Sequence, residues 1–453
     1  MSQIASTGPV RAKMVLDVIA LMEIDMDEQK KQAIIDKLTF IINSMPDDSA
    51  YLAAPPPKID QVVEDGILFL AGESYVAFDK LCDMLQSEKG WREKFSREYL
   101  EEEVIFPLLN SALISSDRMQ LYHDLDAIVS ECESYAEEHT AYLPIDGINM
   151  GVDQLTLGKI TLRNMKGTQF ITFAQQVESE IERHESVQEK REKRLQRWHD
   201  YIQPLLKGKT VATCSTIAEP LRAQELAEQE CAHVIDILRY FIFVSKKKRS
   251  INIGLPGELG YGLSEVVVAS STYELTTRSE VRGPDLFDIT AQTLLEMQQA
   301  GIYDLIDMYR AEKKTDFSDT LLTGIHWVAN ALMQVEPANE FLSLVNCLET
   351  FLTRDVGDAG SISNAIAVGV AWILGPDFAE RQALRKEMKK LYDKRSSITH
   401  TGQQDDLADD LLLLRERVKA FLQAMVQRRD EFKTGGKKSL QLWIDEGPLR
   451  PVP

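Results

Sequence analysis

An arginine and a histidine lie five residues apart in segment 391–402, whose sequence is LYDKRSSITHTG. Arg395 is a permanent cation with a planar donor fork that suits phosphate, and His400 carries an imidazole that titrates near neutral pH. Together these groups are chemically sufficient for metal-free cleavage of RNA. The imidazole would help a 2′-hydroxyl attack the adjacent phosphorus or protonate the leaving oxygen, and the guanidinium would stabilise the phosphorane.

The spacing of these two residues requires a helix to position them. On a continuous helix, five residues correspond to a rise of about 7.5 Å. Gly402 predicts the C-terminal end of the helix, which places His400 in its last turn, and a long arginine can extend past Thr399 toward the histidine. The alternative is structural, because a histidine in the last turn also stabilises the helix dipole.

The predicted helix at residues 378–399 is basic within an acidic chain. From Arg381 to Arg395 it holds seven basic and two acidic residues, a local charge of +5, whereas the whole chain carries −20. An RNA site in such a chain must supply its own positive field. Phosphate contacts are therefore expected from Arg385, Lys389 and Lys394. A solvated helix face is the more common explanation of such a run.

A carboxylate falls on an apolar helix face within residues 339–353. Leu342, Val345 and Leu352 share this face with Glu349. Burial of a carboxylate is costly unless it is paired, so a nearby cation is expected. Two interpretations stay open, namely a structural salt bridge and the orientation of a catalytic group.

Five helices are predicted in the C-terminal part of the chain, where they would pack as a bundle. They span residues 317–333, 339–353, 362–374, 378–399 and 406–430. Residues from 284 onward are expected to contain helices only. The tail from residue 432 is expected to be irregular because of its glycines and prolines.

The middle of the chain is predicted to be α+β. Glycine turns alternate with short β-type runs at residues 141–165, and strands are expected at 251–253 and 265–270 around a glycine-rich loop. A long charged helix is expected over about residues 173–206, and a second over about 217–244.

The predicted fold class is mainly α, with four regions along the chain. These are a helical N-terminal region of unknown role (1–140), an α+β middle domain with long helices and a small sheet (141–283), a helical bundle (284–432) and an irregular tail (433–453). Within the first region, helical spacing covers residues 13–43, a proline-rich linker follows at 53–57, and two or three helices fill 59–138.

The sequence lacks the motifs that phosphate-loop nucleotide binding, zinc binding and membrane insertion require. Gly208, Lys209 and Thr210 end like a phosphate-binding loop, but residue 203 is glutamine where that motif needs glycine. The five cysteines form no CxxC pair, so no zinc site, disulfide framework or other cofactor is expected. The chain lacks a long apolar run and an apolar signal sequence, which predicts a cytoplasmic protein without membrane contact.

The segment LYDKRSSITHTG resembles the signature helix of HEPN domains, in which arginine, four to six residues and histidine form a ribonuclease motif. The order FLSLVNCLETFL, SISNAIAVGVAWILG, LYDKRSSITH is similar to the Apea-like branch of that superfamily. Upstream, RSINIGLPGELG and YLPIDGINM also resemble the regions that precede the domain. The resemblance covers roughly residues 141–428, and its specific part is 341–402.

This resemblance implies a helical, HEPN-type endoribonuclease that acts as a toxin or as an antiviral, abortive-infection effector. It implies a homodimer or higher oligomer, with two Arg/His motifs in one composite site, and activation by a phage or regulatory trigger. Arg395 and His400 would be catalytic, Glu349 would orient Arg395, and Tyr392 would contact RNA or pack.

Two positions depart from the family pattern. Ser396 stands where active members often have Asn, Asp or His, and Thr401 separates the histidine from the glycine that often follows it directly. Ser396 is a weaker polar assistant, although neither change removes a catalytic group. Both changes leave open a non-catalytic RNA- or nucleotide-binding protein that mediates assembly.

Overall fold

The computed structural model describes residues 28–43, 73–87, 90–109, 125, 127–128, 136–245, 251–258, 262–269, 275–282, 285–353, 361–402 and 407–447. The described residues are mainly helical, with a small antiparallel sheet in the middle of the chain and helices at both ends, as predicted. The helix start at 13–27, the linker at 53–57 and the last tail residues, 448–453, lie outside the described residues.

The chain divides into two compact units, and both are discontinuous in sequence. Unit 1 comprises residues 1–140 and 215–226, and unit 2 comprises residues 141–214 and 227–453. The predicted boundary at 283–284 lies inside unit 2. One cluster of buried apolar side chains in this unit runs from Ile145 to Ile444, so the middle region and the bundle share a hydrophobic core.

Unit 1 has a separate helical core. Its described elements are α2 (Glu28–Asn43), α3 (Glu73–Gln86), α4 (Trp91–Lys94), α5 (Arg97–Tyr99) and the π-helical turn η2 (Leu100–Ile105). Phe78, Trp91 and Phe95 are buried there. Glu219 joins the two segments of the unit, because its carboxylate accepts hydrogen bonds from the backbone N–H groups of Ser96 and Arg222.

A four-stranded sheet, most of whose residues belong to unit 2, has the strand order β1-β5-β4-β3. Its strands are β1 (Glu137–Ile145), β3 (Gln154–Leu157), β4 (Ile160–Asn164) and β5 (Thr210–Ala218). The expected β-type runs at 141–165 are confirmed. Sequence reasoning missed β5, whose first five residues are all buried, because the second helix was expected to start near residue 217. That helix, α11, spans Pro220–Val244.

The single helix expected over residues 173–206 is wrong. The chain instead forms α8 (Gly167–His184) and α9 (Gln188–Arg197), followed by η3 (Trp198–Ile202) and α10 (Gln203–Leu206). Extended backbone at Glu185 and Val187 ends one helix before the next begins. The break brings Trp198 back against Phe173, with ring centroids 6.0 Å apart, and so buries apolar surface that one straight helix would leave exposed.

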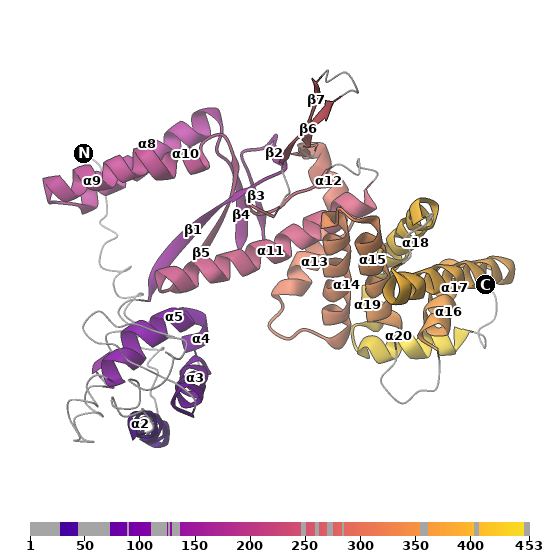
Figure 1. Ribbon diagram of the computed structural model, residues 1–453, viewed down its shortest axis with the longest axis horizontal. Coiled ribbons are helices and arrows are strands. Elements are labelled where there is room, and N and C mark those ends of the chain that lie inside the picture. Colours follow the sequence, from indigo (N-terminus) through magenta and orange to yellow (C-terminus); the bar gives the residue numbers. More distant parts are fainter. Residues whose placement is uncertain are drawn as a thin grey trace, which may run out of the picture. The chain divides into compact units, whose positions relative to one another are not determined.

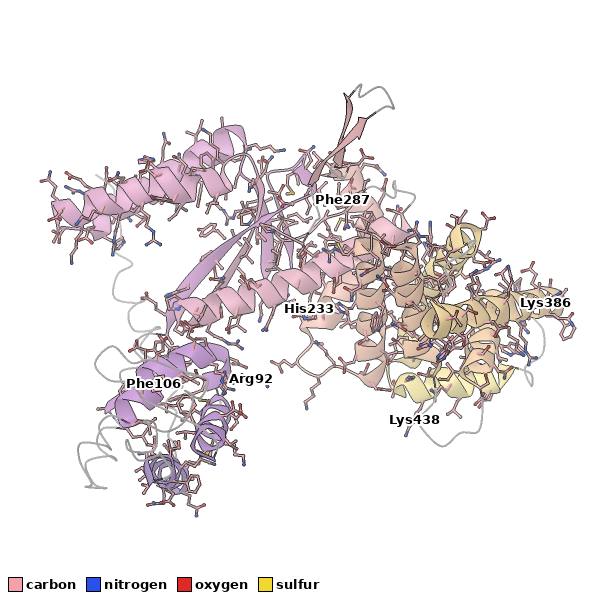
Figure 2. The ribbon with its side chains drawn as sticks, viewed as in Figure 1. Arg92, Phe106, His233, Phe287, Lys386 and Lys438 are labelled. Carbon is pink, nitrogen blue, oxygen red and sulfur yellow. The ribbon has the colours of Figure 1, made fainter. Side chains whose placement is uncertain are left out.

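The expectation of helices only from residue 284 is also wrong. Strand β8 (Phe287–Ile289) pairs in parallel with β2 (Ile148–Met150). Phe287, fully buried, anchors β8 in the shared core, and Figure 2 labels it. Strands β6 (Gly262–Ala269) and β7 (Leu275–Arg282) form an antiparallel pair, which confirms the strand expected near 265–270.

The five predicted bundle helices are all present (Figure 1). They are α14 (Asp316–Met333), α15 (Pro337–Leu352), α16 (Ile362–Leu374), α17 (Phe378–Thr401) and α18 (Leu407–Gln427), preceded by α12 (Ala291–Gln299) and α13 (Ile302–Arg310). The irregular tail is a wrong prediction, because α19 (Arg429–Phe432) and α20 (Gly436–Asp445) follow. Leu440 and Ile444 of α20 are buried in the shared core.

Close packing between α14 and α15 depends on a glycine. A Cβ atom built on Gly324 would lie 2.4 Å from the ring of Phe351, which is fully buried. This contact holds α15, the helix that carries Glu349, in place.

Among the described residues, none of the helices combines the length and apolar character that a membrane span requires.

Candidate functional site

Helix α17 positions both residues of the predicted catalytic pair. Asp377 caps its start by accepting a hydrogen bond from the backbone N–H of Glu380. Gly402 ends it in the left-handed region at φ +67°, and its N–H donates to the carbonyl of Ile398. His400 therefore lies in the last turn, as the sequence predicts.

Arg395 belongs to the inward side of α17. At 100° per residue it falls on the same side as Met388 and Leu391, which are buried. Its Nε lies 3.4 Å from Oε1 of Glu349, with about a quarter of the Arg395 side chain and a fifth of the Glu349 side chain exposed. The cation expected beside Glu349 is therefore Arg395, and it comes from a neighbouring helix.

Tyr392 completes a three-residue cluster with this ion pair. Its hydroxyl donates to Oε1 of Glu349 at 3.1 Å, and the guanidinium carbon of Arg395 lies 5.7 Å from its ring centroid. Burial and the negative charge of Glu349 raise the pKa of Tyr392, so it acts as a neutral donor. Nε of Arg395 is buried without a hydrogen-bond partner, so charge attraction rather than a directed bond holds the guanidinium there.

His400 points to a different side of the helix. Five residues correspond to a rotation of about 140° around the axis, so Arg395 faces α15 while His400 faces away from it. The side chain of His400 is exposed and makes no hydrogen bond or ion pair with the described residues. The expected reach of Arg395 along its own helix toward His400 is not observed, because Glu349 attracts the guanidinium toward the core.

The predicted phosphate contacts have different surroundings. Arg385 is exposed and donates to Oδ1 of Asn364 at 2.9 Å, whereas Lys394 is half-buried and already interacts within the protein. Lys389 is exposed and precedes His400 by three turns on nearly the same face. Lys386 is also exposed, and Figure 2 shows it on the outer side of the bundle. The exposed basic face of α17 therefore includes the histidine.

Other charges of α17 are neutralised locally. Lys390 forms a salt bridge with Asp410 at 3.0 Å, and Glu387 pairs with Arg417, both across to α18. Ser396, the predicted polar assistant, is half-buried beside Arg395 in sequence. The positive field around His400 consequently comes from the outer lysines rather than from the whole basic run.

A second ionisable cluster of unit 2 was missed by sequence reasoning. Nδ1 of His326 on α14 lies 2.7 Å from Oδ2 of Asp236 on α11, and Nε2 lies 3.0 Å from the side-chain amide of Asn330. His233, one turn before Asp236, is labelled in Figure 2. Its ring lies tilted against that of Tyr309, with the ring centroids 4.4 Å apart. Asp236 and His326 are 90 positions apart, and no local sequence pattern indicates that two such distant residues meet.

The two histidines of this cluster differ in protonation. The hydrogen bond to Asp236 raises the pKa of His326 above its usual value, against smaller opposing effects of burial and of Arg239. Burial lowers the pKa of His233, and the positive charges of Lys314 and His326 lower it further, against the carboxylates of Asp236 and Glu230. Protonation of His326 therefore stabilises the folded state, and protonation of His233 opposes it.

We expect His326→Gln to weaken unit 2 at acidic pH. The contribution of His326 is fully present below about pH 6.5, its ordinary pKa, and is lost as the pH rises through its raised value. The urea midpoint of the variant should fall below that of the wild type at pH 5.5 and match it at pH 8.5. His184→Gln, at an exposed histidine, is the control. An equal loss at both pH values would contradict this linkage.

No group of three or more His, Cys, Asp or Glu side chains suited to hold a metal ion occurs among the described residues. Cys82, Cys214, Cys231 and Cys347 are buried free thiols. Comparisons of the chain with family models, with curated proteins and with solved structures gave no match.

Proposed function

We propose that the chain is a metal-independent endoribonuclease of the HEPN type, which cuts RNA through Arg395 and His400. The observation that carries the proposal is the contact of Glu349 on α15 with Tyr392 and Arg395 on α17, the helix that also presents an exposed His400 whose side chain has no partner among the described residues. An acidic chain has no general affinity for RNA, and the exposed lysines of α17 supply a local attraction for phosphate.

Each group has a distinct role in the proposed reaction. His400 accepts the proton of the 2′-hydroxyl as that oxygen attacks phosphorus, or returns a proton to the 5′-oxygen that leaves. The guanidinium of Arg395 stabilises the negative charge of the phosphorane. Glu349 and Tyr392 orient Arg395 and restrict its side-chain freedom before RNA binds.

The proposal includes a second copy of the chain. Arg395 and His400 point about 140° apart on one helix, so one chain does not aim both groups at a single phosphate. Two α17 helices that meet near their C-terminal ends would bring an arginine of one copy near a histidine of the other. A toxin-like or antiviral effector that is active as a dimer is the role that fits this arrangement.

The proposal is tested with purified protein and total RNA in EDTA. We expect RNA to be cut at protein concentrations well below that of the RNA, and the rate per chain to fall on dilution as dimers dissociate. Inducible expression followed by sequencing of RNA ends would identify the substrate. Intact RNA at every protein concentration, with the protein folded, would exclude this function.

A binding function is favoured by one specific observation. Arg395 is partly buried and already paired with Glu349, so it has a structural role whether or not it contacts a phosphate. In this alternative the domain holds RNA or a nucleotide and mediates assembly without turnover. Stoichiometric retention of RNA without new RNA ends, unchanged by His400→Ala, would identify it.

A further inference from the structure

Helix α9 carries a surplus of positive charge on the surface of an acidic chain. From Gln188 to Lys209 the chain holds seven basic and three acidic residues, a local charge of +4, whereas the whole chain carries −20. Figure 1 shows α9 beside α8, and Trp198 contacts Phe173 of α8 on the inner side of this pair. Most other side chains of α9 are exposed. This surplus is separate from the basic face of α17.

Three of these cations form a row along α9. Lys190, Arg194 and Arg197 are spaced by four and three residues, so they lie on one face of the helix. Tyr201 follows four residues after Arg197, within the π-helical turn η3, where hydrogen bonds span five residues and one turn is slightly wider. Tyr201 therefore continues this face. These four residues, called the α9 row, are all exposed and span about 16 Å of helix axis.

The positive charge of the α9 row is largely unpaired. Lys190 and Arg197 form no ion pair or side-chain hydrogen bond with any residue that the structure describes. Arg194 makes a long salt bridge of 3.7 Å to Oε2 of Glu185, and 62% of its side chain is exposed. A phosphate can therefore approach these cations without breaking a close ion pair.

The acidic residues of the segment lie off the row. Glu189 pairs with Lys193 at 2.8 Å, and Glu192 accepts a hydrogen bond from Gln188. Asp200 is adjacent in sequence to the tyrosine of the row, and neighbouring residues of a helix point to different sides. The row therefore presents its cations to solvent without a carboxylate between them.

Tyr201 is an aromatic side chain placed in solvent. It is 71% exposed, whereas Trp198, three positions earlier, is 3% exposed between α8 and α9. Tyr201 makes no hydrogen bond or ring contact with the described residues, so packing does not account for an aromatic side chain here. Exposed aromatic rings beside cations are the usual means by which proteins stack the bases of single-stranded nucleic acid.

We propose that the α9 row binds single-stranded RNA. Its three cations contact phosphates, and Tyr201 stacks on a base. The inference rests on the proposed function, because a ribonuclease with an acidic chain needs further contacts that hold its substrate. Phosphates and base planes are common to all sequences, so binding depends little on the base sequence.

The composition of the row separates a single strand from other polyanions. Stacking on Tyr201 requires an unstacked base, which a duplex does not offer. A membrane surface requires a continuous apolar helix face, whereas three of the four positions of the row are cations. Duplex RNA and anionic vesicles are therefore the competing ligands to measure.

The test is fluorescence anisotropy of labelled oligo(U) with the full chain carrying His400→Ala, which keeps the RNA intact. Lys190→Gln combined with Arg197→Gln should lower the slope of log affinity against log salt by about 1.4, because two phosphate contacts are lost. Lys313→Gln combined with Lys433→Gln removes two exposed cations outside the row and should leave the slope unchanged.

Replacement of Tyr201 separates stacking from charge. Tyr201→Ala should weaken oligo(U) binding about tenfold at an unchanged salt slope, because one base stack is lost. Tyr201→Phe keeps the ring and should bind as the parent does. Circular dichroism should show the same helix content in every variant, because all of the replaced side chains are exposed.

Three results with oligo(U) would overturn the proposal: no binding by the parent, equal losses in the two double variants, or undiminished binding by Tyr201→Ala. Duplex RNA that binds as tightly as oligo(U) would also overturn it. Vesicles of phosphatidylcholine and phosphatidylserine that bind through Lys190 and Arg197 would assign the row to a membrane surface instead. Cleavage is measured separately with His400 intact, so RNA that is cut while the row variants bind normally would remove this proposal and leave the ribonuclease.

Discussion

His400→Ala is expected to reduce RNA cleavage by about 10²- to 10⁴-fold, the contribution that one positioned histidine makes to general acid–base catalysis. The side chain is exposed and makes no hydrogen bond or ion pair with the described residues. Its removal leaves no cavity and no unpaired group in the described structure. The thermal midpoint of the variant should therefore equal that of the wild type, and the loss should appear in cleavage alone.

The matched control for this prediction is His184→Ala. His184 is also an exposed histidine in the last turn of a helix, where it pairs with Glu180. Cleavage by this variant should equal that of the wild type in an EDTA assay of labelled RNA. A folded His400→Ala protein that cuts RNA at the wild-type rate would contradict the proposed role of the histidine.

Arg415→Met is expected to cost about 3–5 kcal/mol of stability, the usual result of removing one partner from a buried ion pair. Arg415 on α18 donates to Glu340 on α15, and Glu340 is only 2% exposed. The variant would leave this carboxylate in the core beside methionine. Urea unfolding followed by circular dichroism measures the loss.

Two further variants define the cause of that loss. Glu340→Leu combined with Arg415→Met removes both charges and should recover most of the stability, because apolar pairs of similar volume replace buried ion pairs at little cost. Arg417 lies on α18 like Arg415, and Arg417→Met breaks its more exposed pair with Glu387 on α17, which should cost about 1 kcal/mol or less. Equal losses for Arg415→Met and Arg417→Met would contradict the argument from burial.

The two glutamates of α15 that pair with arginines differ in how deeply they are buried. Glu340 and Arg415 are almost enclosed, and their pairing is structural. Glu349 on α15 and Arg395 on α17 are partly exposed, and α17 also carries His400 in its last turn. Burial therefore distinguishes a pair that can meet a ligand from one that cannot.

Local sequence patterns predicted the elements whose formation depends on interactions between residues close together in the chain. Apolar spacing identified the five bundle helices. Gly402 marked the end of α17 because glycine readily adopts the left-handed conformation that ends a helix. Strand β8, by contrast, is three residues long and is stabilised by pairing with β2. Three residues are too few to show a periodic pattern, and the strand with which they pair lies far away along the chain.

Local sequence was enough to predict the helix that carries Arg395 and His400, its basic character and the need of Glu349 for a cation, because periodicity, capping and desolvation act over a few residues. The packing of α17 against α15 makes Arg395 this cation and leaves His400 facing away from Glu349. Packing also brought Asp236 to His326. These outcomes depend on how separate elements pack together, and local sequence does not specify such long-range contacts.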